Sequence, residues 1–361
     1  MAKSSFLVKG FESTESANIA AKVAKHLKGV FPKSLNATDE KILIVSDSGF
    51  KSSSNATNSA TMLSYAYHTA AQNLGLNSEL VLQTPRHRAM EVSPEVLSKL
   101  KSLPKKSIIM QCVSNRLGTL NGLGKSFRKY CKSRDHRFTS ASSLGNLTTN
   151  SFKTLVKAHN YNYDSMVKLQ TQLKKKLDSA KEVHISTRAG TDLFFDIENR
   201  NAVFNHGVYS SPGQGGNLPA GEIYIPINRR SAYGKLVIDG SSRQKDTTVL
   251  CKNPINVYFD NGVARKITGG KEAEGLKKTY DWATKRAKHP WGIKMAAELG
   301  IGLNDKSKIV GATILDEKVK GTAHIATGSN HWFGGDIKAI VHLDQVFKNP
   351  VIKLDGERLR I

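Results

Sequence analysis

The sequence has few of the features that mark extracellular or membrane proteins. Its 361 residues include three cysteines, which are odd in number and widely separated, so neither a disulfide framework nor a cysteine metal knuckle is predicted. It has no apolar run of about 18 residues, so no transmembrane helix is predicted. The N-terminal stretch lacks an apolar segment before a small-residue cleavage site, so it does not resemble a secretory signal. We therefore expect a cytoplasmic protein without a membrane partner.

Acidic residues are also scarce. The chain has 54 Lys and Arg against 30 Asp and Glu, a formal net charge of +24. Such a charge attracts polyanions, and nucleic acid is the functional alternative it raises. The basic residues are dispersed, however, and no stretch interleaves aromatic residues with arginines as a base-stacking surface would. We predict a solvated basic surface and no specific nucleic-acid partner.

A nucleotide-binding P-loop is lacking as well. Residues 118–127 (GTLNGLGKSF) contain Gly-Lys-Ser, but Thr119 stands where the first glycine of the motif belongs. We interpret this stretch as a glycine-rich turn. The serine-rich segment around 52–58 is likewise interpreted as a solvated connection, with a substrate contact as the alternative.

The first half of the chain alternates helical and strand patterns. Short β-branched runs at 41–49, 78–83 and 106–114 are typical of strands buried in a parallel sheet, and amphipathic helical segments separate them. This order predicts a doubly wound α/β domain that resembles a Rossmann fold. With the basic helical connector 151–180, this domain is expected to cover residues 1–180.

The second half has a different pattern. From residue 181 onward, short strands are separated by Gly, Asn and Asp turns, and one clear helix interrupts them. We predict that residues 181–361 form a mixed α+β domain with an antiparallel character, and that this domain binds metal.

Histidines and carboxylates in glycine-bounded strand segments of this second domain are the candidate site. In "VHLD", His342 and Asp344 would face the same side, because strand side chains alternate. Glu298 lies among small apolar residues, where a lone charge is costly and calls for a cation. Glu222 follows a Pro-Ala-Gly turn, and His324 lies in "TAHIAT". Such donors suit Zn²⁺, Co²⁺ or Mn²⁺, and five of them suffice for a two-metal centre that activates water for amide hydrolysis.

The same segments carry a family resemblance. "GNLPAGEIYIP", "GKLVIDG", "GGKEAEGL", "AAELGIGLND", "GTAHIATGSNHWFGG" and "VHLDQV" resemble, in this order, the aminopeptidase T family of metallo-aminopeptidases of the thermophilic leucyl type. The resemblance covers about residues 181–361, whereas the first half resembles the family in its α/β layout alone. It implies a homodimeric aminopeptidase that acts on short peptides and binds two divalent metal ions. The implied metal ligands are Glu222, Glu298, His324, His342 and Asp344.

One position departs from this family. The family has a tyrosine seven residues after its first ligand histidine, and here that position is His331. We predict His331 as the electrophilic or proton-donating catalytic group. Glu222 is predicted to act both as a metal ligand and as a catalytic carboxylate that shuttles the proton.

Two alternatives differ in class. The same superfamily includes 2,5-dihydroxypyridine 5,6-dioxygenase, a ring-cleaving enzyme with one Fe(II) held by two histidines and one carboxylate. The pattern of that enzyme resembles this chain in the "HLD" pair, but it has a histidine where this chain has Glu298. In this chain, His331, His342 and Asp344 would form the corresponding set of two histidines and one carboxylate. Because all peptidase-type positions are present, the aminopeptidase is our prediction and the dioxygenase the alternative. A basic binding protein that kept the fold is the third possibility.

Overall fold

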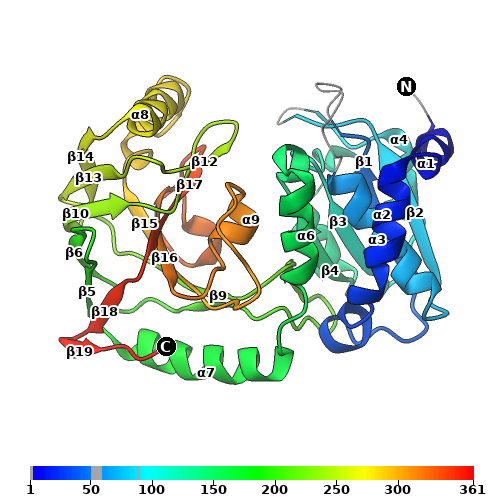
Figure 1. Ribbon diagram of the computed structural model, residues 1–361, viewed down its shortest axis with the longest axis horizontal. Helices are drawn as coiled ribbons and strands as arrows, with labels where there is room; N and C mark the ends of the chain where they lie inside the picture. The colour runs from blue at the N-terminus through cyan, green and yellow to red at the C-terminus, as the bar shows by residue number, and fades with distance from the viewer. Residues whose placement is uncertain (1–2, 50–58, 88–89, 125) are drawn as a thin grey trace. The chain divides into compact units, whose positions relative to one another are not determined.

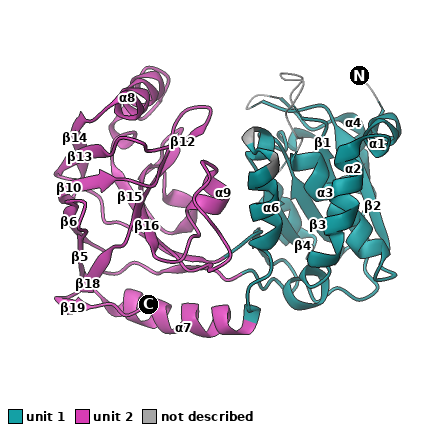
Figure 2. Cartoon of the chain, in the orientation of Figure 1, with its two compact units in different colours: residues 1–163, 207–220 teal, residues 164–206, 221–361 magenta. Residues whose placement is uncertain are grey.

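The computed structural model describes residues 3–49, 59–87, 90–124 and 126–361. The serine-rich segment 52–58 and Lys125 of the glycine-rich turn lie outside these residues. The chain divides into two compact units (Figure 2): unit 1 comprises residues 1–163 and 207–220, and unit 2 comprises residues 164–206 and 221–361. The chain therefore passes between the units after residues 163, 206 and 220, whereas the sequence analysis placed one boundary after residue 180.

Unit 1 is built on a parallel sheet, as the buried β-branched runs predicted. Its strand order is β2-β1-β3-β4-β8, and the neighbouring strands run parallel. The central strands are buried along their whole length, which explains their continuous apolar character. The strands are β1 (Ile42–Asp47), β2 (Ser78–Gln83), β3 (Ile108–Cys112), β4 (Arg137–Ala141) and β8 (Gly215–Asn217). The helices are α1 (Ser4–Glu12), α2 (Glu15–Val23), α3 (Ser59–Gln72), α4 (Pro94–Ser102), α5 (Phe127–Ser133) and α6 (Thr149–Lys157).

Unit 2 contains two antiparallel sheets of seven strands each (Figure 1). The first has the order β14-β13-β10-β6-β5-β18-β19 and comprises β5 (Glu182–Ser186), β6 (Asp192–Asp196), β10 (Tyr233–Ile238), β13 (Ile255–Asp260), β14 (Val263–Thr268), β18 (Val351–Leu354) and β19 (Glu357–Arg358). The second has the order β12-β11-β17-β16-β15-β9-β7 and comprises β7 (Val203–Asn205), β9 (Glu222–Pro226), β11 (Ser241–Arg243), β12 (Thr248–Leu250), β15 (Ala296–Gly302), β16 (Thr322–Gly328) and β17 (His342–Lys348). Unit 2 also contains α7 (Tyr163–Ser179, apart from its first residue), α8 (Lys271–Thr284) and α9 (Thr313–Asp316). The predicted parallel sheet and antiparallel strands are thus present. The doubly wound arrangement of unit 1, with helices on both faces of its sheet, stays a prediction.

The register of the second sheet brings the candidate donors to one face. Glu298 of β15 lies opposite Ala326 of β16, which in turn lies opposite Asp344 of β17. Two residues further along β15, Gly300 lies opposite His324 of β16. Because side chains alternate along each strand, these positions share a face. Small residues beside the long ones leave room there for imidazole and carboxylate groups.

Across residues 3–49, 59–87, 90–124 and 126–361, no helix is both long enough and apolar enough to span a bilayer.

Candidate metal centre

Three side chains converge closely enough to hold one ion. Glu298, His342 and Asp344 each offer a donor atom, and these atoms lie within 4.8 Å of one another. The Nε2 atom of His342 is 3.1 Å from Oδ1 of Asp344 and 3.4 Å from Oε2 of Glu298. Glu298 and Asp344 are buried. Buried carboxylates need a counter-charge, and a divalent cation supplies one.

His324 lies beside this cluster and closes it on the β16 side. Its Nε2 atom is 3.1 Å from Oε1 of Glu298 and 3.9 Å from Oε2 of Glu222. The imidazole lies directly over Gly300, where a Cβ atom would come within 2.1 Å of the ring. Its Nδ1 atom is buried and has no hydrogen-bond partner among the described residues. Nε2, the nitrogen that faces the carboxylates, is the one in position to ligate a cation in this cluster.

Glu222 is close to His324, but its charge is already matched. Its Oε1 atom accepts hydrogen bonds from Nδ2 of Asn205 at 2.7 Å and from Nζ of Lys318 at 3.0 Å. Lys318 is fully buried and also contacts the carboxylate of Glu317. Lys318, Glu317 and Asn205 were not among the site residues predicted from the sequence. The adjacent acid and base in "DEKVKG" were the signal for the first two, and nothing local pointed to Asn205.

The histidines take their charge state from the surrounding carboxylates. Burial lowers the pKa of His324, but the hydrogen bond to Glu298 and the nearby carboxylate charges outweigh it and raise the pKa to about 9. The same competition raises the pKa of His342 to about 10, with Asp344 as its strongest partner. Burial raises the pKa of Asp344, but His342 and the other cations outweigh it and hold the pKa below its usual range. Without an ion, protons supply the positive charge here; a metal ion would displace them on binding.

Ser329 orients two histidines at once. Its hydroxyl donates to the carbonyl oxygen of Ile337 at 3.2 Å, so the hydroxyl oxygen accepts from Nδ1 of His331 at 2.9 Å. Its backbone carbonyl accepts from Nδ1 of His342 at 2.7 Å. Both histidines are therefore held, in their neutral forms, with Nε2 as the acceptor nitrogen. Such a hydrogen bond behind the ring is the usual support of a metal-binding histidine.

The structure brings four of the five predicted ligands into direct contact: Glu298, His324, His342 and Asp344. Glu222 lies next to them, engaged with Lys318. Their role as ligands stays a prediction. His331 is exposed and does not belong to the donor cluster found within the described residues, so the alternative set with His331, His342 and Asp344 is not assembled there.

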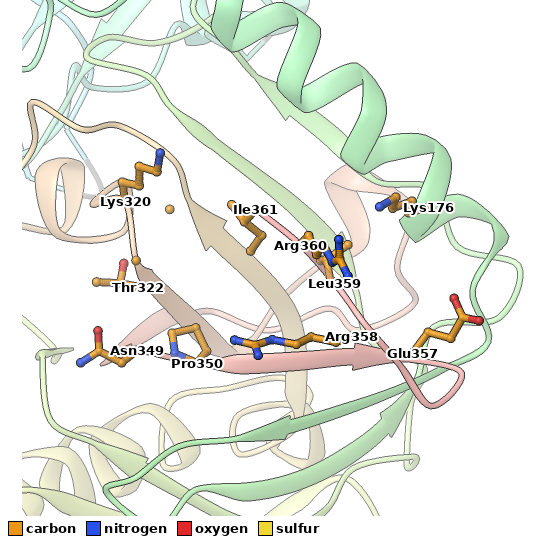
Figure 3. Close-up of a pocket in the computed structure, with 12 residues that line it drawn as sticks. Lys176, Lys320, Thr322, Asn349, Pro350, Glu357, Arg358, Leu359, Arg360 and Ile361 are labelled. Atoms are coloured by element: carbon orange, nitrogen blue, oxygen red, sulfur yellow. The ribbon is translucent and has the colours of Figure 1, made fainter.

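A separate basic hollow lies elsewhere in unit 2 (Figure 3). It has a volume of about 1020 Å³, and Lys176, Lys320, Arg358 and Arg360 line it, together with Gly302 at the end of β15 and Thr322 at the start of β16. None of the candidate metal donors lines this hollow. This hollow is therefore not part of the candidate metal centre.

Fold and donor cluster define a two-unit protein with a candidate site for a divalent ion. Comparison with known families makes this specific. The family model described as 2,5-dihydroxypyridine 5,6-dioxygenase matches residues 160–360, more than half of the chain. The chain belongs to this family.

Individual relatives agree with the family. The 2,5-dihydroxypyridine 5,6-dioxygenase of Pseudomonas putida KT2440 is 28% identical over 187 residues, which is 50% of this chain and 53% of that protein. The match therefore spans about half the length of this curated relative. The solved structure of 2,5-dihydroxypyridine dioxygenase from the same organism superposes with a TM-score of 0.69 at 17% identity, covering 96% of each chain. AmpT from Thermus thermophilus superposes with a TM-score of 0.63 at 14% identity, covering 93% of this chain and 96% of AmpT. At these identities the two structures show the fold alone.

The predicted aminopeptidase is wrong, and with it the hydrolase and proteolysis assignment. The family match and the curated relative both name a dioxygenase, and the likeness to AmpT is one of fold. The error has a physical origin: an imidazole–carboxylate cluster on a shared sheet serves hydrolysis and oxygen chemistry alike, so residue types alone did not separate the two. What the chain shares with both solved structures is the fold. The predicted homodimer and the expected lack of a specific nucleic-acid partner stay predictions.

Proposed function

We propose that this protein is a mononuclear non-haem iron dioxygenase that opens the ring of a dihydroxylated aromatic compound of the 2,5-dihydroxypyridine type. The observation that carries the proposal is the convergence of Glu298, His342 and Asp344, with donor atoms within 4.8 Å of one another, in a chain of the dioxygenase family. A mixed imidazole and carboxylate set on one side of an ion is the arrangement of non-haem Fe(II) oxygenases.

The charges around the cluster favour one ion rather than two. Glu298 and Asp344 together carry the two negative charges that one divalent cation neutralises. The third carboxylate, Glu222, forms an ion pair with the ammonium of Lys318 at 3.0 Å. This ion pair occupies the carboxylate that a second metal ion would need as a ligand. Adding a second dication beside a buried ammonium would be opposed by strong repulsion in this low-dielectric region. The expected pair of Zn²⁺, Co²⁺ or Mn²⁺ ions is therefore replaced by a single Fe(II).

The donor set fits ferrous iron but departs from two histidines and one carboxylate. His342 is the imidazole of the converging set, and His324 lies 3.1 Å from Glu298 as a second imidazole next to it. Ferrous iron, when bound, supplies the redox chemistry that lets dioxygen react with an electron-rich ring. Both oxygen atoms enter the opened product and the ring supplies the electrons, so no separate reductant is needed.

The residues around the ion would bind the ring and move its proton. The hydrogen bond from Nδ1 of His331 to Ser329 leaves Nε2 of His331 as an acceptor. In the proposed reaction, Nε2 takes the proton of a ring hydroxyl, which makes the ring a better electron donor. The bond from His342 to the backbone of Ser329 keeps that imidazole directed at Glu298 and Asp344. His331 is thus reassigned from a proton donor in peptide hydrolysis to a proton acceptor.

The proposal is tested on protein purified without air. We expect one iron per chain by metal analysis, and oxygen uptake that matches ring opening when 2,5-dihydroxypyridine is added. Asp344→Asn should lose both iron and oxygen uptake, because it removes one of the two charges that hold the ion. Asp305→Asn is the matched control, since Asp305 is exposed and pairs with Lys306 at the surface. Two metal ions per chain together with no oxygen uptake would overturn the proposal.

A further inference from the structure

Three aromatic side chains form a continuous row beside the donor cluster. The ring of Tyr224 is 5.2 Å from that of Phe333, which is 5.2 Å from that of Trp332. Trp332 then reaches His342, with 5.0 Å between the ring centres. Each contact is edge-to-face, the geometry that aromatic pairs prefer. We call Tyr224, Trp332 and Phe333 the aromatic wall.

The aromatic wall borders the donors because of the sheet register. Tyr224 of β9 lies opposite Gly300 of β15, and Gly300 lies opposite His324 of β16. One end of the wall therefore lies on the same face of the sheet as His324, across Gly300, and the ring of Trp332 at the other end is 5.0 Å from that of His342. A flat molecule held on the wall would have its edge close to the candidate iron site.

Trp332 is the exposed member of the wall. Its side chain is 52% exposed, a large apolar surface next to a cluster of charges. A large apolar side chain exposed next to convergent polar groups is typical of a ligand-binding surface. The indole offers a flat face that an aromatic ring can cover, with little loss of side-chain entropy.

The segment that carries Trp332 and Phe333 is held firmly. Asn330 is fully buried; its side chain donates to the carbonyl of Ala297 at 2.9 Å and accepts from the backbone N–H of Ile337 at 2.8 Å. Arg200 donates to the carbonyl of Gly334 at 2.9 Å. The two rings are thus presented in a defined position before any ligand arrives, which lowers the entropy cost of binding.

We propose that the aromatic wall is the surface that binds the ring of the substrate, with Trp332 as the stacking residue that selects flat aromatic rings over saturated rings carrying the same hydroxyl groups. The inference rests on the proposed function for the identity of its ligand as a dihydroxylated ring. It adds the residues that discriminate that ligand. The hydroxyl groups are handled by the donor cluster and His331, and the flatness of the ring by Trp332.

The test compares two probes that differ in aromaticity. Hydroquinone and cyclohexane-1,4-diol have the same hydroxyl pattern, and their affinities for the iron-loaded full-length protein are measured by calorimetry without oxygen. We expect hydroquinone to bind more tightly than the diol. Trp332→Leu should weaken hydroquinone binding about tenfold without changing binding of the diol, whereas Trp332→Phe should retain most of the affinity.

Trp291→Leu is the matched control. Trp291 is also exposed, at 43%, and it lies under the guanidinium of Arg229. This control should bind both probes like the unaltered protein. Trp332→Leu protein that binds hydroquinone as tightly as the control does would overturn the inference.

Failure of the inference is separable from failure of the proposed function. Ring binding that depends on Trp332, in a protein that consumes no oxygen, supports the aromatic wall and refutes the dioxygenase. Oxygen uptake with an unchanged KM in Trp332→Leu supports the dioxygenase and refutes the aromatic wall.

Discussion

Replacement of Lys318 by methionine is the sharpest test of the buried charges around the candidate site. The ammonium is fully buried, 3.0 Å from Glu222 and in contact with Glu317. Burial raises the pKa of Glu317 to about 8, whereas the two carboxylates outweigh burial and hold the pKa of Lys318 above its usual range. Methionine has a similar length but no charge, so it would leave Glu222 buried without its cation. Removing one partner of a buried ion pair costs about 3–5 kcal/mol.

For a unit of this size, that loss corresponds to a fall in Tm of about 6–20 °C. Differential scanning calorimetry of the metal-free protein measures it. Lys277→Met is the matched control: Lys277 pairs with Glu274 at 2.8 Å, but both are exposed, so no measurable change is expected.

The second variant separates charge from packing. Lys318→Met combined with Glu222→Gln should recover part of the lost stability, because no unpaired charge then remains on Glu222. A single variant as stable as the Lys277→Met control, or a double variant less stable than Lys318→Met alone, would refute the electrostatic reasoning.

Three further outcomes are expected. Gly300→Ala places a methyl group within 2.1 Å of the His324 ring and should weaken metal affinity about tenfold or more, measured by competition with a chelator; unchanged affinity would contradict the placement of His324. Ser329→Ala removes the acceptor for His331 and should lower the ring-opening kcat about tenfold, with iron content retained because the backbone carbonyl persists; equal loss of both would point to a structural role instead. Burial lowers the pKa of His159 from 6.5 to about 4, so below pH 6.5 the unfolded chain takes up a proton that the folded chain does not. As the pH is lowered from about 6.5 to 4, the free energy of unfolding of unit 1 should therefore fall, and His159 should contribute up to about 3 kcal/mol of that fall. Urea titration at each pH measures it, and the His159→Gln variant should show a smaller fall.

Local patterns in the sequence were sufficient for several features of the fold. The continuous β-branched runs predicted the parallel sheet, since strands covered on both faces need apolar residues at every position. The alternation in "VHLD" placed His342 and Asp344 on one face, and their side chains are 3.1 Å apart. Both inferences depend on neighbours in the chain, and backbone geometry alone makes them reliable.

The identity of the enzyme class was not accessible in the same way. Glu298, His324, His342 and Asp344 suit both a hydrolytic and an oxidative metal centre, so their resemblance to the ligand positions of the aminopeptidase T family led to the wrong class. The family was decided by the family model that matches residues 160–360.

Tertiary structure alone decided which charges meet. Lys318 lies 96 residues from Glu222 in the sequence, and their contact depends on how the segment after α9 meets the start of β9. The position of His324 over Gly300 likewise depends on the register between β15 and β16. A buried ion pair and a strand register are fixed by the whole packed unit, because each is set by desolvation and steric fit among segments far apart in the chain.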